Sequence, residues 1–391
     1  MLLTIQSHIS DGGFSRVYLA VVENSDKRVA LKKAHITKYV KNSQLRHEAA
    51  LLLHLRGHPS IPQVFAWGRS QYYEYLALEI LGDSVSTVAS NPDKPLTLAN
   101  LVALICQMDL ECRDQLDAIE HVHSRYITHA DIKPGNFLFD QHSQDGRIRL
   151  IDFGLSIPNR DLVTLAHIPE TEARSLRGTS RYASIPVHMH RICARRDDME
   201  SLAYTIVKLL RGSLPWHALD DHNAICRMKQ AWSGPSLCAG YPSVFGEFVQ
   251  YTRGIRFDEA PRYARWRAAF RSLVPSGSDS YVPTDATEPY VGKEFLKGDE
   301  GNLTGSGEDI RDAPHTDSSV GNSLPSSDDD WSPTSSWADP INIRNAHLVG
   351  DEQKAVRDSL EGFDEPPGRG TEFSSLSQRS AVQVVEVMEP L

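Results

Sequence analysis

One segment constrains this chain more than any other, THADIKPGNFLF at residues 128–139, which is followed by IRLIDFGLS at residues 148–156. Apolar runs flank the polar residues in both segments, so the pattern predicts two short strands of a hairpin. Asp145 and Gly146 would lie near its turn, because this pair of residue types favours tight reversals. Such a hairpin would bring the polar residues of the two segments together.

Four of those polar residues have the types and the spacing that phosphoryl transfer from a magnesium nucleotide requires. Asp131 can orient an attacking hydroxyl by accepting its proton, and Lys133 can offset charge on the transferring oxygens. Asn136 and Asp152 offer oxygen ligands for one or two Mg²⁺ ions. A solvated loop with scattered Asp and Lys is the alternative, and it would leave this spacing to coincidence.

The two segments resemble the catalytic loop and the DFG motif of eukaryotic protein kinases, and the other motifs of that family follow in order. The resemblance implies an α+β, two-lobed protein kinase fold over residues 1–273. A small, mostly β N-lobe would cover about residues 1–80, and a large, mostly α C-lobe about residues 81–273. Residues 274–391 would form an acidic, Ser/Gly/Pro-rich disordered tail.

The segment ISDGGFSRVY, residues 9–18, resembles the glycine loop that covers the nucleotide in these kinases. Ser10 and Ser15 stand where the family usually has its first and third glycines. Taken alone, the segment could equally be a Gly-Gly turn between two strands. The nucleotide-contacting residues that the resemblance implies here are Ile9, Gly12, Gly13 and Val17, with Val17 as an apolar lid over the adenine.

The next motif, RVALKKA at residues 28–34, reads as an alternating strand. Lys32 matches the phosphate-gripping lysine of the family's VAIK motif, and Ala30 belongs to the same nucleotide-binding set. Lys33 would point to the opposite face, because side chains alternate along a strand. Glu48 lies in SQLRHEAALLLHL, which has helical spacing, and would pair with Lys32. A surface glutamate is the alternative reading.

An apolar strand, YLALEILGDSV at residues 75–85, breaks at Gly82 and resembles the hinge between the two kinase lobes. The resemblance implies that backbone groups of Glu79 and Leu81 hydrogen-bond the adenine. Leu78 would then guard the back of the nucleotide pocket.

Residues 176–216, from LRGTSRYAS to GSLPW, narrow the family, because they closely resemble the casein kinase I group of serine/threonine kinases. The SIP sequence at residues 184–186 stands where that group has Ser-Ile-Asn instead of APE. The RRDDMESL run at residues 195–202 matches its signature helix, in which Asp198 would anchor the catalytic loop. The likeness covers roughly residues 6–273.

The group phosphorylates Ser or Thr three residues after a phosphoserine or an acidic cluster, so the resemblance implies protein substrates of that kind. Such a preference needs a basic anion site. Arg181 and Arg227 fall at the group's anion-site positions, and Thr179 at the threonine that contacts Asp131 and Lys133. Two departures relax this expectation: DFGLSIPNR lacks the group's paired lysines, and DDHNAICR is less basic than its counterpart.

Two further departures concern the C-lobe. Ala130 replaces the HRD arginine that usually binds a phosphorylated activation loop, while His129 keeps the rest of the motif. We therefore expect no need for phosphorylation of that loop. Residues 107–124 are about five residues longer than the family's helix, which an outward bulge or a wrongly predicted coding sequence would explain.

From Pro275 onward the sequence changes to Ser, Gly, Asp and Pro with few apolar runs, which is typical of disorder. This part holds 23 Asp and Glu against 8 Lys and Arg, so its charge is −15, and the chain's −10 leaves +5 for residues 1–274. The tail could compete with substrates for the anion site; a solubilising tail is the alternative. Ser332, three residues after Asp329, resembles a substrate, and once phosphorylated it would prime Ser335.

The rest of the composition excludes several classes of function. The five cysteines lack metal-ligand spacing and read as free thiols. No apolar run approaches the ~20 residues of a membrane span, and the basic residues are dispersed. We therefore expect a cytoplasmic or nuclear monomer that binds protein substrates but neither nucleic acid nor membrane.

The resemblance as a whole predicts a Ser/Thr kinase that uses ATP and Mg²⁺. A pseudokinase scaffold would explain Ser10, Ser15 and Ala130, but not why the other catalytic residues are intact. A small-molecule kinase of the aminoglycoside type also has an H-x-D loop with a later asparagine. Lys133, the DFG sequence and GTSRYAS argue against that class.

Overall fold

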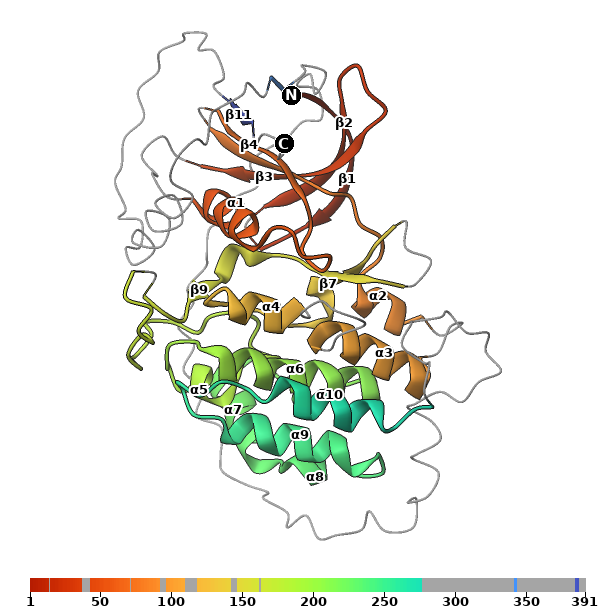
Figure 1. The fold of residues 1–391 in the computed structure, drawn as a ribbon, viewed down its shortest axis with the longest axis vertical. Helices are drawn as coiled ribbons and strands as arrows, with labels where there is room; N and C mark the ends of the chain where they lie inside the picture. Colours follow the sequence, from red (N-terminus) through yellow and green to blue (C-terminus); the bar gives the residue numbers. More distant parts are fainter. Residues whose placement is uncertain are drawn as a thin grey trace, which may run out of the picture.

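The chain forms two lobes, a β-sheet with one long helix above a larger helical body (Figure 1). The computed structural model describes residues 1–13, 15–36, 43–70, 72–91, 96–109, 118–141, 146–161, 163–275, 341–342 and 384–386. This is the expected α+β kinase architecture. Apart from residues 274–275 and the two shortest of these ranges, the expected disordered tail lies outside the described residues.

The N-lobe sheet is antiparallel, with strand order β10-β1-β2-β3-β5-β4-β11. Its strands are β1 (Leu2–Asp11), β2 (Arg16–Val22), β3 (Arg28–His35), β4 (Val64–Arg69), β5 (Tyr73–Leu78), β10 (Ile341–Asn342) and β11 (Val384–Glu386). Leu3, Leu31 and Ala77 are fully buried in a core cluster on one face of the sheet. The alternating pattern leaves the other face for the cleft between the lobes.

Helix α1 (Gln44–Leu55) is the helix expected from its spacing, and it begins where the Ser43 side chain accepts a hydrogen bond from the Arg46 amide. Strand β5 ends at Leu78, four residues before the Gly82 at which we expected it to break. The chain leaves the sheet early because the Gly82 amide donates to the Phe139 carbonyl of the C-lobe, 2.7 Å away.

The C-lobe packs around α6 (Arg195–Arg211), in which all but three residues are buried. Its other helices are α2 (Val85–Ala89), α3 (Leu98–Asp109), α4 (Ala118–Ser124), α5 (Ile185–His188), α7 (His222–Ala231), α8 (Gly234–Leu237), α9 (Ser243–Gly254) and α10 (Tyr263–Arg271). Of the lengthened stretch at residues 107–124, the first residues belong to α3 and the last to α4, and residues 110–117 lie outside the described residues. None of the helices described is long and apolar enough to cross a membrane.

Short elements between α4 and α5 carry the polar residues singled out above. They are β6 (Ile127–Thr128), η1 (Pro134–Asn136), β7 (Phe137–Phe139), β8 (Ile148–Leu150), η2 (Phe153–Leu155) and β9 (Ile157–Pro158). The predicted hairpin is confirmed, since β7 pairs with β8 in the register Phe137↔Leu150. Asp145, expected near its turn, lies outside the described residues.

Replacement of Phe270 by alanine tests whether α10 belongs to the folded domain. The Phe270 ring is 1% exposed and lies 5.5 Å from Phe245 and 5.2 Å from Phe248, centroid to centroid. We expect Phe270→Ala to lower the free energy of unfolding by about 3–5 kcal/mol in urea denaturation. Ala268→Ser, on the exposed side of the same helix, should change it by no more than about 0.5 kcal/mol.

Candidate active site

An ion pair and a second carboxylate lie together in the cleft between the lobes. Lys32 Nζ lies 2.5 Å from Glu48 Oε1 on α1 and 3.4 Å from Asp152 Oδ1, which follows β8. Lys33, the neighbouring lysine, places its ammonium 4.1 Å from the Tyr73 ring on the opposite face of β3. The structure therefore forms the Lys32–Glu48 pair that the sequence predicted, adds Asp152 to it, and separates Lys33 from all three.

Electrostatics favour the charged forms of Lys32 and Asp152, whereas burial raises the pKa of Glu48. Burial alone would lower the pKa of Lys32, but the carboxylates of Glu48 and Asp152 outweigh it and raise that pKa. Burial also acts to raise the pKa of Asp152, yet the cations around it, led by Lys32, lower it below its ordinary value. Asp152 is thus an anion that can accept a cation from solution.

The catalytic loop forms a second polar group. Asp131 Oδ2 lies 2.7 Å from Lys133 Nζ, and Asp131 Oδ1 accepts hydrogen bonds from the amide and the hydroxyl of Thr179, both at 2.8 Å. Lys133 Nζ also donates to Thr179 Oγ1 at 2.9 Å. The Asn136 amide donates to the Asp131 carbonyl at 2.8 Å. The contacts expected for Thr179 are therefore present.

Two oxygen donors suit a magnesium ion here. The Asn136 nitrogen is engaged by Asp131, which leaves the amide oxygen for a cation, and Asp152 offers its carboxylate. No cluster of three or more His, Cys, Asp or Glu side chains that could hold a metal exists within the described residues. This donor set fits Mg²⁺, which keeps waters and phosphate oxygens as its remaining ligands.

Apolar side chains of the N-lobe sheet face the cleft opposite these groups, and are called the apolar ceiling below. Val17 is paired with Lys32, and Ala30 with Leu78, so all four side chains share the cleft face of the sheet. Leu78 is 5% exposed. The apolar side chains of Val17, Ala30 and Leu78 suit contact with a purine ring.

Other residues expected around the nucleotide are placed at the rim of this ceiling. Gly12 and Gly13 form the turn between β1 and β2, where the Gly12 amide donates to the Ser15 carbonyl at 2.8 Å. Ile9 falls at a break in the β1–β2 register, between His8 and Ser10, and is 49% exposed. The sequence pattern contained no signal for this irregularity.

The hinge follows β5 and contains Glu79 and the half-buried Leu81. The Glu79 amide donates to the Gln63 carbonyl at 2.9 Å, and its carboxylate lies 3.1 Å from Arg149 Nη1. Arg149 also pairs with Asp140 at 2.9 Å. The hinge is thereby fastened to the β7–β8 hairpin, which carries the catalytic loop.

The catalytic loop has an unusual backbone that one buried carboxylate holds. Ala130 and Asp152 both have left-handed φ angles, 67° and 70°. Asp198 of α6 accepts the backbone amides of His129 and Ala130 at 2.7 and 2.8 Å, the anchoring role expected of it. The conformation persists because these hydrogen bonds offset its strain.

Apolar contacts hold the segment from β9 to α5, here called the activation segment, against Ala130. Most kinases have an arginine at the position of Ala130. Ala130 packs with Ala183, Val187 and Cys193 in a small buried cluster. Farther along, Arg196 Nη2 lies 2.6 Å from Glu170 Oε1, and Arg177 donates to the Leu155 carbonyl at 3.0 Å. These contacts fix the position of the segment.

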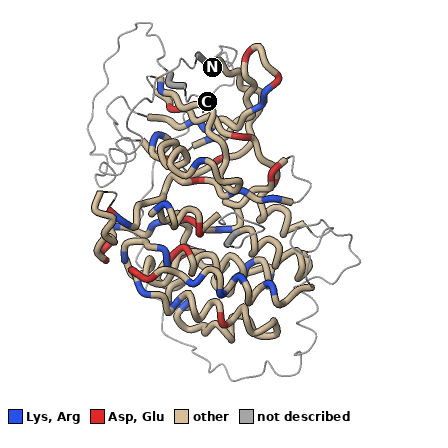
Figure 2. The backbone as a smooth tube through the Cα atoms, viewed as in Figure 1, with Lys and Arg blue, Asp and Glu red and all other residues tan. Residues whose placement is uncertain are grey.

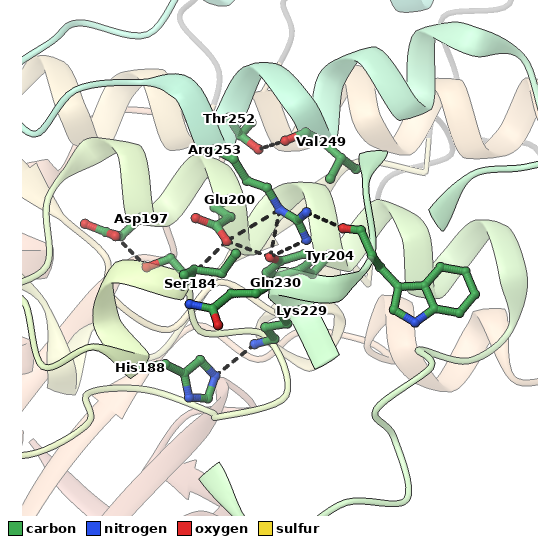
Figure 3. Close-up of polar contacts among 12 residues, drawn as sticks. Ser184, His188, Asp197, Glu200, Tyr204, Lys229, Gln230, Val249, Thr252 and Arg253 are labelled. Atoms are coloured by element: carbon green, nitrogen blue, oxygen red, sulfur yellow. Dashed lines mark hydrogen bonds and ion pairs between the residues drawn. The ribbon is translucent and has the colours of Figure 1, made fainter. Parts of the chain in front are cut away.

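The sequence pattern did not predict a group of buried polar side chains beneath this segment, which Figure 3 shows. Lys229 of α7 is fully buried and donates to the carbonyls of Ser180 and Ala183 at 2.8 and 2.6 Å, with His188 3.0 Å away. The only signal in the sequence is that Lys229 lies one helical turn after the buried Ile225.

A second group of hydrogen-bonded side chains beneath the activation segment centres on Tyr204. Its hydroxyl donates to Glu200 Oε1 at 2.6 Å and accepts from the guanidinium of Arg253 (Figure 3). Glu200 also accepts the backbone amide of Ile185 at 3.0 Å. This group joins α6 and α9 to the start of α5, and so supports the end of the activation segment.

The two arginines expected at an anion site each face an aspartate. Arg181 Nη2 lies 3.5 Å from Asp220 Oδ1, and Arg227 Nη2 lies 4.0 Å from Asp221 Oδ2. All four side chains are at least 40% exposed.

A histidine cluster ties α1 to the C-lobe. His121 Nε2 lies 2.9 Å from the Leu55 carbonyl, and His54 Nε2 lies 3.1 Å from the Arg125 carbonyl. The His58 ring stacks on His121 with centroids 4.3 Å apart. Since α1 carries Glu48, these contacts help to fix the position of the ion pair.

Replacement of Gly178 should disturb the catalytic loop. Gly178 has φ +83°, and a Cβ there would lie 2.4 Å from the Ala130 carbonyl oxygen. We expect Gly178→Ala to displace Asp131 and lower the rate of phosphate transfer by about 10²-fold or more. Gly57 is the control, since it has φ +91° and open space around it. Gly57→Ala should cost about 1–2 kcal/mol of stability and leave the rate unchanged.

The histidine cluster predicts a loss of stability in acid. Burial lowers the pKa of His58 to about 4, from an ordinary 6.5, and also lowers that of His121. As pH falls from 6.5 towards 4, the unfolded chain takes up protons that the folded protein does not bind, so the free energy of unfolding falls. His58→Gln should flatten this slope in urea denaturation. The exposed His8→Gln should keep it, and an equal slope in both variants would refute the assignment.

A comparison with known protein families matches residues 3–237 to the protein kinase domain. The match runs from β1 to the end of α8 and covers more than half of the 391 residues. It includes the glycine turn, Lys32, Glu48, the catalytic loop and Asp152, whose geometry has been described above. The chain therefore belongs to the protein kinase family.

Proposed function

We propose that this protein is a serine/threonine kinase of the casein kinase I type, which transfers the γ-phosphate of Mg-ATP to protein substrates. One observation carries the proposal: the Lys32–Glu48–Asp152 trio and the Asp131–Lys133–Thr179 group are both assembled around the same cleft. A kinase needs the lysine–glutamate pair and the metal-binding aspartate in place together.

The residues divide the work between binding and chemistry. Mg-ATP supplies the phosphoryl group when bound, and Asn136 and Asp152 would hold its metal. Lys32 grips the phosphates while Glu48 keeps the lysine side chain extended. The apolar ceiling covers the adenine.

Asp131 orients the substrate hydroxyl and takes its proton as the oxygen attacks the γ-phosphorus, while the bond from that phosphorus to the bridging oxygen breaks and ADP leaves. Thr179 fixes the carboxylate with two hydrogen bonds to Oδ1, so the Oδ2 side meets the substrate and Lys133. The Lys133 ammonium stabilises negative charge that develops on the transferred group. Lys133 also donates a hydrogen bond to Thr179, and so links Asp131 to the part of the activation segment that contains Thr179.

The preference for Ser and Thr in an acidic or phosphorylated context is supported by the resemblance of residues 176–216 to casein kinase I enzymes. Arg181 lies two residues after Thr179, on the segment that contacts the catalytic base. A guanidinium in that position can meet a carboxylate or phosphate on the substrate.

Incubation with Mg-ATP and casein tests the activity. We expect phosphate on serine and threonine, and a loss of about 10²–10⁴-fold in kcat for Asp131→Asn, because the general base is removed. Lys32→Met should also abolish transfer. Asp26→Asn, an exposed substitution in the N-lobe, should leave the rate unchanged. A pseudokinase scaffold would bind nucleotide without transfer in every variant, and transfer that survives Asp131→Asn would refute the assigned base.

A further inference from the structure

Arg181 lies two residues after Thr179, which binds the catalytic base, and its guanidinium already faces a carboxylate. The backbone carbonyl of Arg181 accepts a hydrogen bond from the Trp216 indole at 2.8 Å, and two residues earlier Thr179 binds Asp131. Its own Nε donates to the His217 carbonyl at 3.0 Å, which turns the guanidinium towards Asp220. The Asp220 carboxylate lies 3.5 Å away and is 95% exposed. A substrate anion that approaches Arg181 therefore meets Asp220 as well.

Asp221 and Arg227 form a second pair of the same kind, in which the aspartate directly follows Asp220. Asp221 begins α7, because its carboxylate accepts the Ala224 amide at 2.7 Å. That hydrogen bond fixes the carboxylate 4.0 Å from the guanidinium of Arg227. The position of this negative charge is thus set by the helix start and not by a mobile side chain.

The local charges cancel. Arg181 lies just after Thr179, Asp220 and Asp221 lie in the loop before α7, and Arg227 lies in α7; the net charge of these four side chains is zero. Figure 2 shows the same mixture of Lys, Arg, Asp and Glu over both lobes. At a few ångströms, an exposed carboxylate lowers the affinity for a neighbouring anion by up to about fivefold, and less in high salt.

We propose that Asp220 and Asp221 are specificity-determining residues that act as built-in counter-ions. They compete with acidic and phosphorylated groups of the substrate for Arg181 and Arg227. The kinase therefore accepts peptides without a phosphate or acidic cluster more readily than its arginines alone would allow. This inference rests on the proposed function, because it concerns the substrates of the same site.

Steady-state kinetics on two peptides test the inference. The peptides share one sequence with a single phosphoacceptor serine, and differ only in a phosphoserine or an alanine three residues before it. We expect Asp220→Asn to lower KM for the phosphorylated peptide by about two- to fivefold. Its kcat, and the KM for the alanine peptide, should not change. Asp221→Asn should act in the same direction and keep α7 intact, since asparagine also caps helices.

Two controls separate this effect from a general loss of negative charge. Asp258→Asn removes an exposed aspartate that lies 3.8 Å from Arg256, before α10, and should leave both KM values unchanged. Addition of Arg181→Gln to Asp220→Asn should abolish the gain, because the freed arginine is then missing. The gain should also shrink as salt is raised.

The outcomes are distinct. An unchanged ratio of the two KM values in both aspartate variants overturns the counter-ion role, although transfer to both peptides continues. A gain that persists without Arg181 overturns the pairing with that arginine. If the wild-type protein transfers phosphate to neither peptide nor to casein, the proposed function itself fails.

Discussion

The geometry of the whole site depends on one buried carboxylate. Asp198 accepts hydrogen bonds from the backbone amides of His129 and Ala130, and its carboxylate lies 2.8 Å from His123 Nε2. The left-handed turn at Ala130 costs roughly 1–2 kcal/mol for a residue with a Cβ. Each hydrogen bond to a carboxylate contributes about 1.5–3 kcal/mol, so two of them outweigh the strain. Asp131 points into the cleft because the residue before it is held in this way.

The N-lobe is brought to that loop through α1. Glu48 pairs with Lys32, His47 Nε2 lies 2.8 Å from the Ser156 carbonyl, and the Phe153 ring meets His129 at 4.8 Å. The His47 contact joins α1 to the segment after β8, and the Phe153 contact joins that segment to the catalytic loop. The Lys32–Asp152 contact also connects the two lobes, through residues that would bind phosphate and metal.

The sequence predicted the parts of this molecule that rest on local pattern or on motif. The alternation of RVALKKA placed Lys32 and Lys33 on opposite faces, and the helical spacing after Ser43 placed Glu48 on a helix. Other features depend on partners far away in the chain. The early end of β5, for example, follows from the bond between Gly82 and Phe139.

By itself, the sequence determined the two-lobed kinase architecture and the candidates for the catalytic residues, because alternation, helical period and motif spacing are local properties. Only the tertiary structure decided how charges are balanced. Lys229 is buried against backbone carbonyls, and Asp220 faces Arg181 across 39 positions of sequence. The basic side chains that suggested an anion site were visible in the sequence, but their counter-ions became visible only when the chain was folded, since ion pairing depends on distance in space.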